Sequence, residues 1–200
     1  MSIYDFFENI YYLISRQPHP NLVDLILKQW NLLKPKSRVI DIGAGEGNLA
    51  LELLNHVDVH FELCDIDRKK LSSIPLNPSI SVNVTDAKEL DFPDESFDTA
   101  FCINALHHFE SPDLSIKEII RVLKKNGRLL IVDFERQSLL TRTFGIVATL
   151  QRRHCRFFTL SELTQSLESL GLKTQPVKIN HFQIAVIGEK ENLNVSKSGN

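Results

Sequence analysis

The chain has 200 residues, of which 42% are hydrophobic, and a formal net charge of −2 at pH 7. This length and composition suit one domain with a full core, which we expect over residues 1–190, followed by a polar, disordered tail over 191–200. The near-neutral charge gives no sign of a nucleic-acid partner or of general attraction to an anionic membrane.

The cysteines and the first residues indicate a reduced compartment. Cys64, Cys102 and Cys155 are odd in number and far apart, and the first two sit in apolar runs typical of buried thiols. The chain start lacks the pattern of a signal peptide, and no apolar run approaches transmembrane length. We therefore expect a cytoplasmic protein without stable membrane insertion, present as a monomer or a homodimer.

The N-terminal segment predicts two helices. Apolar residues recur at helical spacing over residues 3–15, and a Gln-Pro-His-Pro break follows. A second helix is expected over 21–33, with Asn21 as its N-cap. Residues 1–34 are thus expected to form a helical cap on the domain.

A glycine-rich turn follows the first predicted strand. Residues 38–47 read Arg-Val-Ile-Asp-Ile-Gly-Ala-Gly-Glu-Gly, and apolar residues at helical spacing come next. Glycines in such a turn permit a positive φ and let backbone N–H groups approach a ligand, and the following helix start adds N–H donors. The spacing is one residue shorter than the G-x-G-x-x-G dinucleotide fingerprint, and Asp41 lies two positions before the first glycine.

Further strands alternate with helices after this turn. Residues 57–65 and 80–85 alternate between polar and apolar, as strands near a sheet edge do, whereas residues 128–134 are almost wholly apolar, as in a strand covered on both faces. Another strand is expected over 97–103. This alternation predicts a parallel, doubly wound sheet with strands one, four and five in its centre.

Helix signals separate these strands. A short helix is expected over residues 67–73, and a longer one begins at Ser111, with Pro112 at its first position. An i, i+3, i+4, i+7 apolar stripe continues this helix to Leu123, and Gly127 is expected to cap its C-terminal end.

The last third predicts a helix and a hairpin. Thr159 and Glu162 match a capping box, and Gly171 ends the apolar helical pattern that follows. Two strands are expected over 172–179 and 181–188. Because about one residue separates them, they can pair only in antiparallel orientation.

Four aspartates fall at or near the carboxyl ends of predicted strands, where open α/β sheets bind ligands: Asp41, Asp65, Asp86 and Asp133. Asp65 lies 22 residues after Gly43, where a carboxylate can accept both hydroxyls of a ribose. Each acid alone is more typical of a solvated turn residue than of a ligand site. The glycine turn together with Asp65 and Asp86 at successive strand ends favours a ligand site.

Residues 41–47 resemble motif I, (D/E)-x-G-x-G-x-G, of the class I S-adenosylmethionine (SAM) methyltransferases. Residues 91–109 and 121–129 resemble the small-molecule group near the ubiquinone/menaquinone-biosynthesis methyltransferases, and the resemblance covers roughly residues 4–188. It implies a Rossmann-like α/β fold: a mostly parallel, seven-stranded sheet in the order 3-2-1-4-5-7-6, with the last strand antiparallel. It also implies SAM as cofactor, S-adenosylhomocysteine as product, and methyl transfer to O, N or C of a small molecule by in-line displacement.

The same resemblance implies which residues hold the cofactor. Asp65 would bind the ribose with Ile66 near the adenine, Asp86 and the Ala87 backbone would bind the adenine edge, and Asn104 would line the methionine side. Tyr12, like Tyr4, would close over SAM from the N-terminal helix, although core packing explains both tyrosines equally well. The full expected set is Asp41, Gly43, Ala44, Gly45, Gly47, Asp65, Ile66, Asp86, Ala87, Asn104 and Tyr12.

Two histidines are candidate bases. Methyl transfer from a sulfonium relies on positioning and desolvation, and it needs a base only where the acceptor must lose a proton. His107 and His108 follow the fourth strand, where the acceptor should sit; because adjacent side chains diverge, at most one is expected to face it. Asp133 and Glu135 are secondary candidates. No metal is expected, since adjacent histidines do not have ligand spacing.

Residues 138–157 are the expected lid over the acceptor pocket. The segment is apolar and then basic, which suits an apolar acceptor with an acidic group, or contact with a membrane surface. A lid helix with a solvated basic end explains the same pattern.

Three other functions compete with this reading. A methyltransferase of DNA amino groups would carry prolines after the fourth strand, where this chain has Asn-Ala-Leu-His at 104–107, and the near-neutral charge also argues against nucleic acid. A SAM-binding regulator or subunit without catalysis would keep the same motif. A nicotinamide oxidoreductase is disfavoured by the glycine spacing and by the terminal hairpin.

Overall fold

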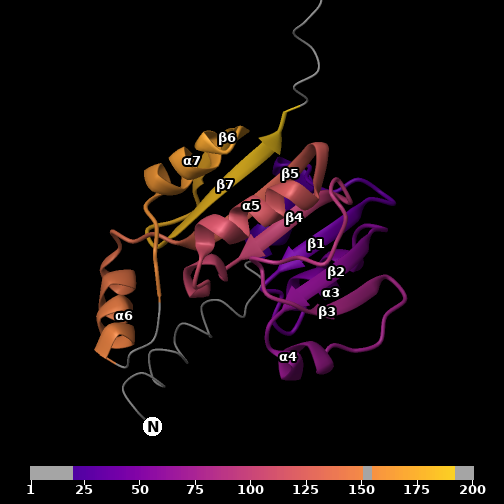
Figure 1. The fold of residues 1–200 in the computed structure, drawn as a ribbon, viewed down its shortest axis with the longest axis horizontal. Helices are drawn as coiled ribbons and strands as arrows, with labels where there is room; N and C mark the ends of the chain where they lie inside the picture. Colours follow the sequence, from indigo (N-terminus) through magenta and orange to yellow (C-terminus); the bar gives the residue numbers. More distant parts are fainter. Residues whose placement is uncertain (1–19, 151–154, 192–200) are drawn as a thin grey trace, which may run out of the picture.

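The computed structural model describes residues 20–150 and 155–191, and its strands form one seven-stranded sheet (Figure 1). The order is β3-β2-β1-β4-β5-β7-β6, which confirms the expected methyltransferase topology. Only β7 runs antiparallel to its neighbours, β5 and β6. The strands are β1 (Arg38–Ile42), β2 (His60–Asp65), β3 (Ile80–Val84), β4 (Phe97–Ile103), β5 (Leu123–Phe134), β6 (Leu172–Lys178) and β7 (Gln183–Lys190).

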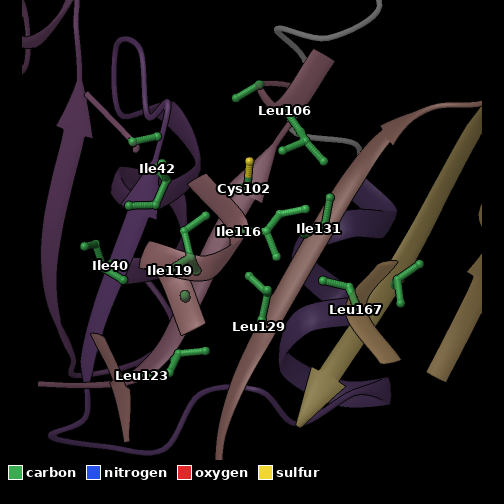
Figure 2. Packing of buried hydrophobic residues seen from close by; sticks show 14 of the residues in the cluster. Ile40, Ile42, Cys102, Leu106, Ile116, Ile119, Leu123, Leu129, Ile131 and Leu167 are labelled. Carbon is green, nitrogen blue, oxygen red and sulfur yellow. The ribbon is translucent and has the colours of Figure 1, made fainter. Parts of the chain in front are cut away.

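Helices cover both faces of this sheet. They are α2 (Pro20–Asp24), the π-helical turn η1 (Leu25–Gln29), α3 (Asn48–Leu54), α4 (Arg68–Ser72), the 3₁₀ turn η2 (Leu106–His108), α5 (Pro112–Val122), α6 (Leu139–Leu150) and α7 (Leu160–Ser169). On one face, Ile116 and Ile119 of α5 pack over Ile40 and Leu129 of the central strands (Figure 2). The opposite face packs against α2, η1, α3 and α4. Because successive strand residues point to opposite faces, the central strands are buried on both.

The helix expected over 21–33 is wrong in its length and in its cap. Asn21 lies inside α2, and the helix continues only through η1 to Gln29. Leu32 is buried outside the helix, where its carbonyl accepts a 3.0 Å hydrogen bond from the Thr99 hydroxyl. Long-range contacts with the sheet thus override the local helical pattern.

The second strand is shorter than expected and is covered on both faces. It begins at His60 rather than at residue 57, and its four middle residues are buried. Glu62, one of them, accepts a hydrogen bond from the Asn83 side chain of β3, and burial raises the pKa of its carboxyl group. The polar and apolar alternation predicted a half-exposed strand here, but β3 and not β2 forms the exposed edge of the sheet.

Gly127 does not cap α5 as expected. The helix ends at Val122, β5 begins at once, and Asn126 takes the left-handed conformation with φ 59°. Gly127 is required for another reason, since a Cβ there would lie 2.7 Å from the carbonyl oxygen of Lys124.

Several local predictions are confirmed. Pro112 begins α5, Thr159 and Glu162 form both bonds of the capping box of α7, and Gly171 follows with φ 84°. Cys64 and Cys102 are buried free thiols whose pKa values burial raises. Across residues 20–150 and 155–191, no helix is long and apolar enough to span a bilayer. The expected helix over 3–15, with Tyr4 and Tyr12, lies outside the described residues, as does the expected tail over 191–200 apart from its first residue.

Candidate cofactor and acceptor site

The glycine turn connects β1 to α3 and lies against the carboxyl end of β2. Gly43, Gly45 and Gly47 all have positive φ, at 75°, 57° and 70°. The backbone N–H groups of Gly43 and Ala44 both donate to the carbonyl of Cys64 in β2, at 2.7 and 3.0 Å. The turn is therefore fixed against the next strand by main-chain hydrogen bonds, and left-handed backbone explains the three glycines.

The glycines differ in what surrounds them. A Cβ on Gly43 would lie 2.4 Å from the Cβ of Ala105, so the turn touches the segment after β4. A Cβ on Gly45 would meet only the Lys70 side chain, at 4.0 Å. Open space beside a left-handed turn is where a ligand can approach the backbone.

Asp65 is held against this turn. One carboxylate oxygen accepts from the Gly45 N–H at 2.9 Å, and the other accepts from the Asp67 N–H at 2.8 Å. The next side chain, Ile66, is 74% exposed, although it is large and apolar. A fixed carboxylate beside an exposed apolar side chain offers an acceptor for hydroxyl groups and a surface for an aromatic ring.

Asp41 lies beneath the same turn. Its side chain is 4% exposed, and burial, with a smaller contribution from the Asp65 charge, raises its carboxyl pKa from 3.8 to about 7. Among the residues that the structure describes, the carboxylate has no hydrogen-bond or cationic partner. A buried acid of this kind is common at functional sites.

Asn104 follows β4 with an unusual backbone. Its φ is 52°, and its N–H donates to the carbonyl of Val132 in β5 at 2.8 Å. Its side-chain oxygen is buried and accepts no hydrogen bond from the described residues. A buried acceptor without a donor is costly, so this oxygen fits a cationic or N–H donor on a ligand such as the amino group of SAM.

Asp86 and Ala87 lie beside the end of β2. The Thr85 N–H donates to the Asp65 carbonyl at 3.1 Å, which places the following residues next to Asp65. The Asp86 side chain is exposed and pairs with Lys88 at 3.2 Å, whereas Ala87 is buried. Of the expected cofactor set, every member but Tyr12 thus falls at the carboxyl ends of β1, β2, β3 and β4.

His107 and Asp133 form a buried pair between the ends of β4 and β5. Their side chains are 0% and 1% exposed, and the imidazole Nδ1 lies 2.6 Å from a carboxylate oxygen. That carboxylate also accepts from the backbone N–H groups of His107 and Phe134, at 3.0 and 2.7 Å. Because a carboxylate can only accept, this contact favours a proton on Nδ1.

Aromatic rings enclose His107, while His108 faces outward. Phe157 stacks on the His107 ring at 5.0 Å between centroids, and Phe134 meets it edge-on at 5.8 Å. His108 is exposed, and its Nδ1 lies 3.9 Å from the Cys155 sulfur. The expectation that the two side chains diverge is wrong, because their rings lie 4.0 Å apart between centroids, tilted by 49°, although only His108 is exposed.

Sequence reasoning missed the pairing of His107 with Asp133 and the part played by Phe157. His107 and Asp133 were separate candidates, and the only shared signal was that each lies at or just after the carboxyl end of a central strand. Glu135 has a local role, because its carboxylate accepts from the Leu160 N–H at the start of α7, at 3.3 Å. Across residues 20–150 and 155–191, no group of three or more His, Cys, Asp or Glu residues could hold a metal ion.

Comparison with known proteins places this geometry among methyltransferases. The family described as "Methyltransferase domain" matches residues 13–177. The phosphatidylethanolamine N-methyltransferase of Cereibacter sphaeroides is 32% identical over 126 residues, which are 60% of this chain and 59% of that protein. The ubiquinone/menaquinone biosynthesis C-methyltransferase UbiE of Pseudomonas paraeruginosa is 30% identical over 119 residues, 54% of this chain and 46% of that protein. The chain thus matches about half the length of these relatives.

A solved structure agrees with the fold. Phosphoethanolamine N-methyltransferase 2 of Haemonchus contortus, solved in complex with SAM, superposes with a TM-score of 0.75 at 17% identity. The match covers 86% of this chain and 53% of that one. These findings confirm the resemblance to class I methyltransferases.

Proposed function

The chain belongs to the methyltransferase domain family, and from this premise we propose that it binds SAM at the glycine turn and methylates a small-molecule acceptor. The hydrogen bond from Gly45 to Asp65 carries this proposal, because it fixes a ribose-type carboxylate beside an open, left-handed turn. Bound SAM would supply an electrophilic methyl group on a positively charged sulfur.

In this proposal the residues at each strand end bind a different part of SAM. Asp65 accepts the ribose hydroxyls, Ile66 covers one face of the adenine, and Asp86 with the backbone of Ala87 binds its edge. The methionyl end lies along residues 43–47, with Asp41 beneath it. The buried oxygen of Asn104 accepts from its amino group, which gives that oxygen the donor it lacks among the described residues.

For the acceptor side, we propose that His108 is the base where one is needed and that His107 positions it. The exposure of His108 supports this division, as does the enclosure of His107 between Asp133 and Phe157. The names of the relatives favour acceptors bearing an amine or a quinol-type ring. Positioning of acceptor and methyl group in line supplies most of the rate enhancement.

Calorimetric titration tests the cofactor. Wild-type protein should bind SAM and S-adenosylhomocysteine and should not bind NADH, and Asp65→Ala should lose at least about tenfold in affinity, since two hydroxyls lose a charged acceptor. Asp58→Ala is the matched control: it removes an exposed aspartate before the other end of β2 and should bind like wild type. Absence of SAM binding, or equal binding by both variants, would contradict the proposal.

Methyl transfer from labelled SAM to amine and quinol acceptors then separates an enzyme from a SAM-binding subunit. His108→Gln should lower kcat and leave SAM affinity unchanged. Tight SAM binding without transfer to any acceptor class would favour the non-catalytic alternative.

A further inference from the structure

Helix α6 has two faces of opposite exposure. Thr141, Phe144 and Ala148 are buried, and Phe144 meets Phe157 edge-on at 6.0 Å between centroids. This face anchors the helix to the aromatic cluster above the end of β5. In Figure 1 the helix stands at the margin of the molecule, away from the sheet.

The opposite face of α6 is apolar and exposed. Leu139, Ile146 and Leu150 are 80%, 64% and 79% exposed, and their i, i+7, i+11 spacing places them on one side of the helix. The hydroxyls of Thr143 and Thr149, on the flanks, donate to the helix carbonyls of Leu139 and Gly145 at 2.9 and 2.8 Å. Because these two hydroxyl groups bond to the helix backbone, the surface that this side of α6 presents to solvent is mainly apolar.

Positive charge accompanies this face. From residue 136 to residue 161 the sequence contains arginines and no aspartate or glutamate. Arg142 lies between Leu139 and Ile146 along the same side, and its side chain is exposed. Among the described residues its guanidinium pairs with no carboxylate, unlike Arg136 and Arg156, which pair with Glu162 and Asp113. An exposed apolar stripe with an uncompensated cation is typical of helices that lie on anionic bilayers.

We propose that α6 docks this protein on an anionic lipid surface, with Leu139, Ile146 and Leu150 inserted among the headgroups and Arg142 against their phosphates. The helix has 12 residues, about 18 Å, enough to lie in the interface but too short to cross it. A second copy of the chain fits less well, because a two-fold contact between these segments would offer Arg142 no carboxylate from residues 136–161. With a net charge of −2, attraction depends on this local patch and not on the whole molecule.

Docking by α6 would orient the acceptor side toward the lipid. The buried face of the helix continues through Phe144 and Phe157 to His107, next to the ends of β4 and β5. An apolar acceptor could then move from the bilayer to this edge without crossing water. The docking proposal itself does not depend on the cofactor assignment.

Flotation with lipid vesicles tests the proposal. Wild-type protein should bind vesicles of equal phosphatidylglycerol and phosphatidylcholine, and should bind pure phosphatidylcholine vesicles much more weakly. The double variant Ile146→Glu/Leu150→Glu should lose at least about tenfold in partitioning, since two apolar insertions become like-charge repulsions. Arg142→Gln should lose about fivefold at low salt and less at high salt.

Controls separate docking from misfolding and from general stickiness. Leu76→Glu replaces a leucine that is as exposed as any on α6 but lies in the loop before β3, and it should partition like wild type. All variants should keep the wild-type circular dichroism spectrum, because the replaced side chains are exposed. Failure of wild type to float with anionic vesicles, or unchanged flotation of the double variant, would overturn the proposal. So would a dimer in light scattering that the double variant dissociates. SAM titration of the same preparations reports the cofactor proposal separately.

Discussion

The two halves of the candidate site are built by different means. At the ends of β1 and β2, main-chain hydrogen bonds and left-handed glycines shape the turn, and the Asp65 carboxylate accepts from the backbone N–H groups of Gly45 and Asp67. At the ends of β4 and β5, side chains shape the site: His107 is hydrogen-bonded to Asp133 and stacked against Phe157.

This difference separates what family members can share from what they can vary. A turn that binds through its backbone keeps its shape whatever side chains surround it, provided that the glycines stay. A pocket built from packed side chains changes with each substitution. The first half therefore suits a common cofactor, and the second suits an acceptor that differs between proteins.

Removing Asp133 should have the largest effect on stability. Asp133→Ala leaves the Nδ1–H of His107 and two backbone N–H groups buried without an acceptor, and we expect a loss of about 4 kcal/mol in the free energy of unfolding. Urea denaturation followed by circular dichroism measures this loss. Asp133→Asn should lose less, about 2 kcal/mol, because its amide can accept two of the three hydrogen bonds.

The exposed pair of Asp113 and Arg156 is the control for this buried pair. Asp113→Ala should cost less than about 1 kcal/mol, since both side chains are more than half exposed. Equal losses for Asp133→Ala and Asp113→Ala would remove the contrast between the two halves of the site.

Gly43→Ala should destabilise the glycine turn at the ends of β1 and β2. The alanine Cβ would lie 2.4 Å from that of Ala105 in a left-handed conformation, and the strain and overlap together should cost about 3 kcal/mol. SAM affinity should fall with it. Gly171→Ala is a matched control, because its φ is 84° but no atom lies within 4 Å of the new Cβ, and it should cost about 1 kcal/mol. The two melting curves measured side by side give the cost of the close approach alone.

Asp41→Asn should have a smaller, pH-dependent effect. Its pKa is raised from 3.8 to about 7 in the folded protein, so folding favours the protonated acid. Its contribution to stability is fully present below about pH 4 and is lost as the pH rises through about 7. Asparagine does not titrate, and the variant should gain about 2 kcal/mol relative to wild type between pH 4 and pH 6.

Denaturation of both proteins across this pH range measures the gain. Gly171→Ala, which removes no titratable group, should run parallel to wild type. A parallel profile for Asp41→Asn would show that burial of this carboxyl group carries no such cost.

The features that the sequence predicted correctly are mainly those determined by residues close together in the chain. The glycine turn, the capping box at Thr159 and the order of the sheet are all confirmed. Each depends on spacing within a few residues, or on a family resemblance carried by such spacing. The helix expected over 21–33 was wrong because its carbonyls bond to β4 and β5, with which it shares no local signal.

The half of the candidate site at the ends of β4 and β5 could be predicted only in part. His107 and Asp133 were found separately by their positions after strands, but their partnership spans 26 residues and depends on strand register. Likewise, the left-handed residue after α5 is Asn126, and Gly127 is needed because a Cβ there would meet the Lys124 backbone. Such constraints arise from packing after the sheet has formed.

The placement of β7 has a consequence for the order in which the protein is made. β7 pairs with β5 over seven residue pairs, from Arg128 with Glu189 to Phe134 with Gln183, yet β6 leaves the ribosome first. Until residues 183–190 emerge, the edge of β5 that faces away from β4 has no partner strand, and unpaired apolar edges aggregate. If translation stalls before residue 183, we therefore expect the nascent chain to need protection by a chaperone. The sheet is complete only when β7 has inserted between β5 and β6.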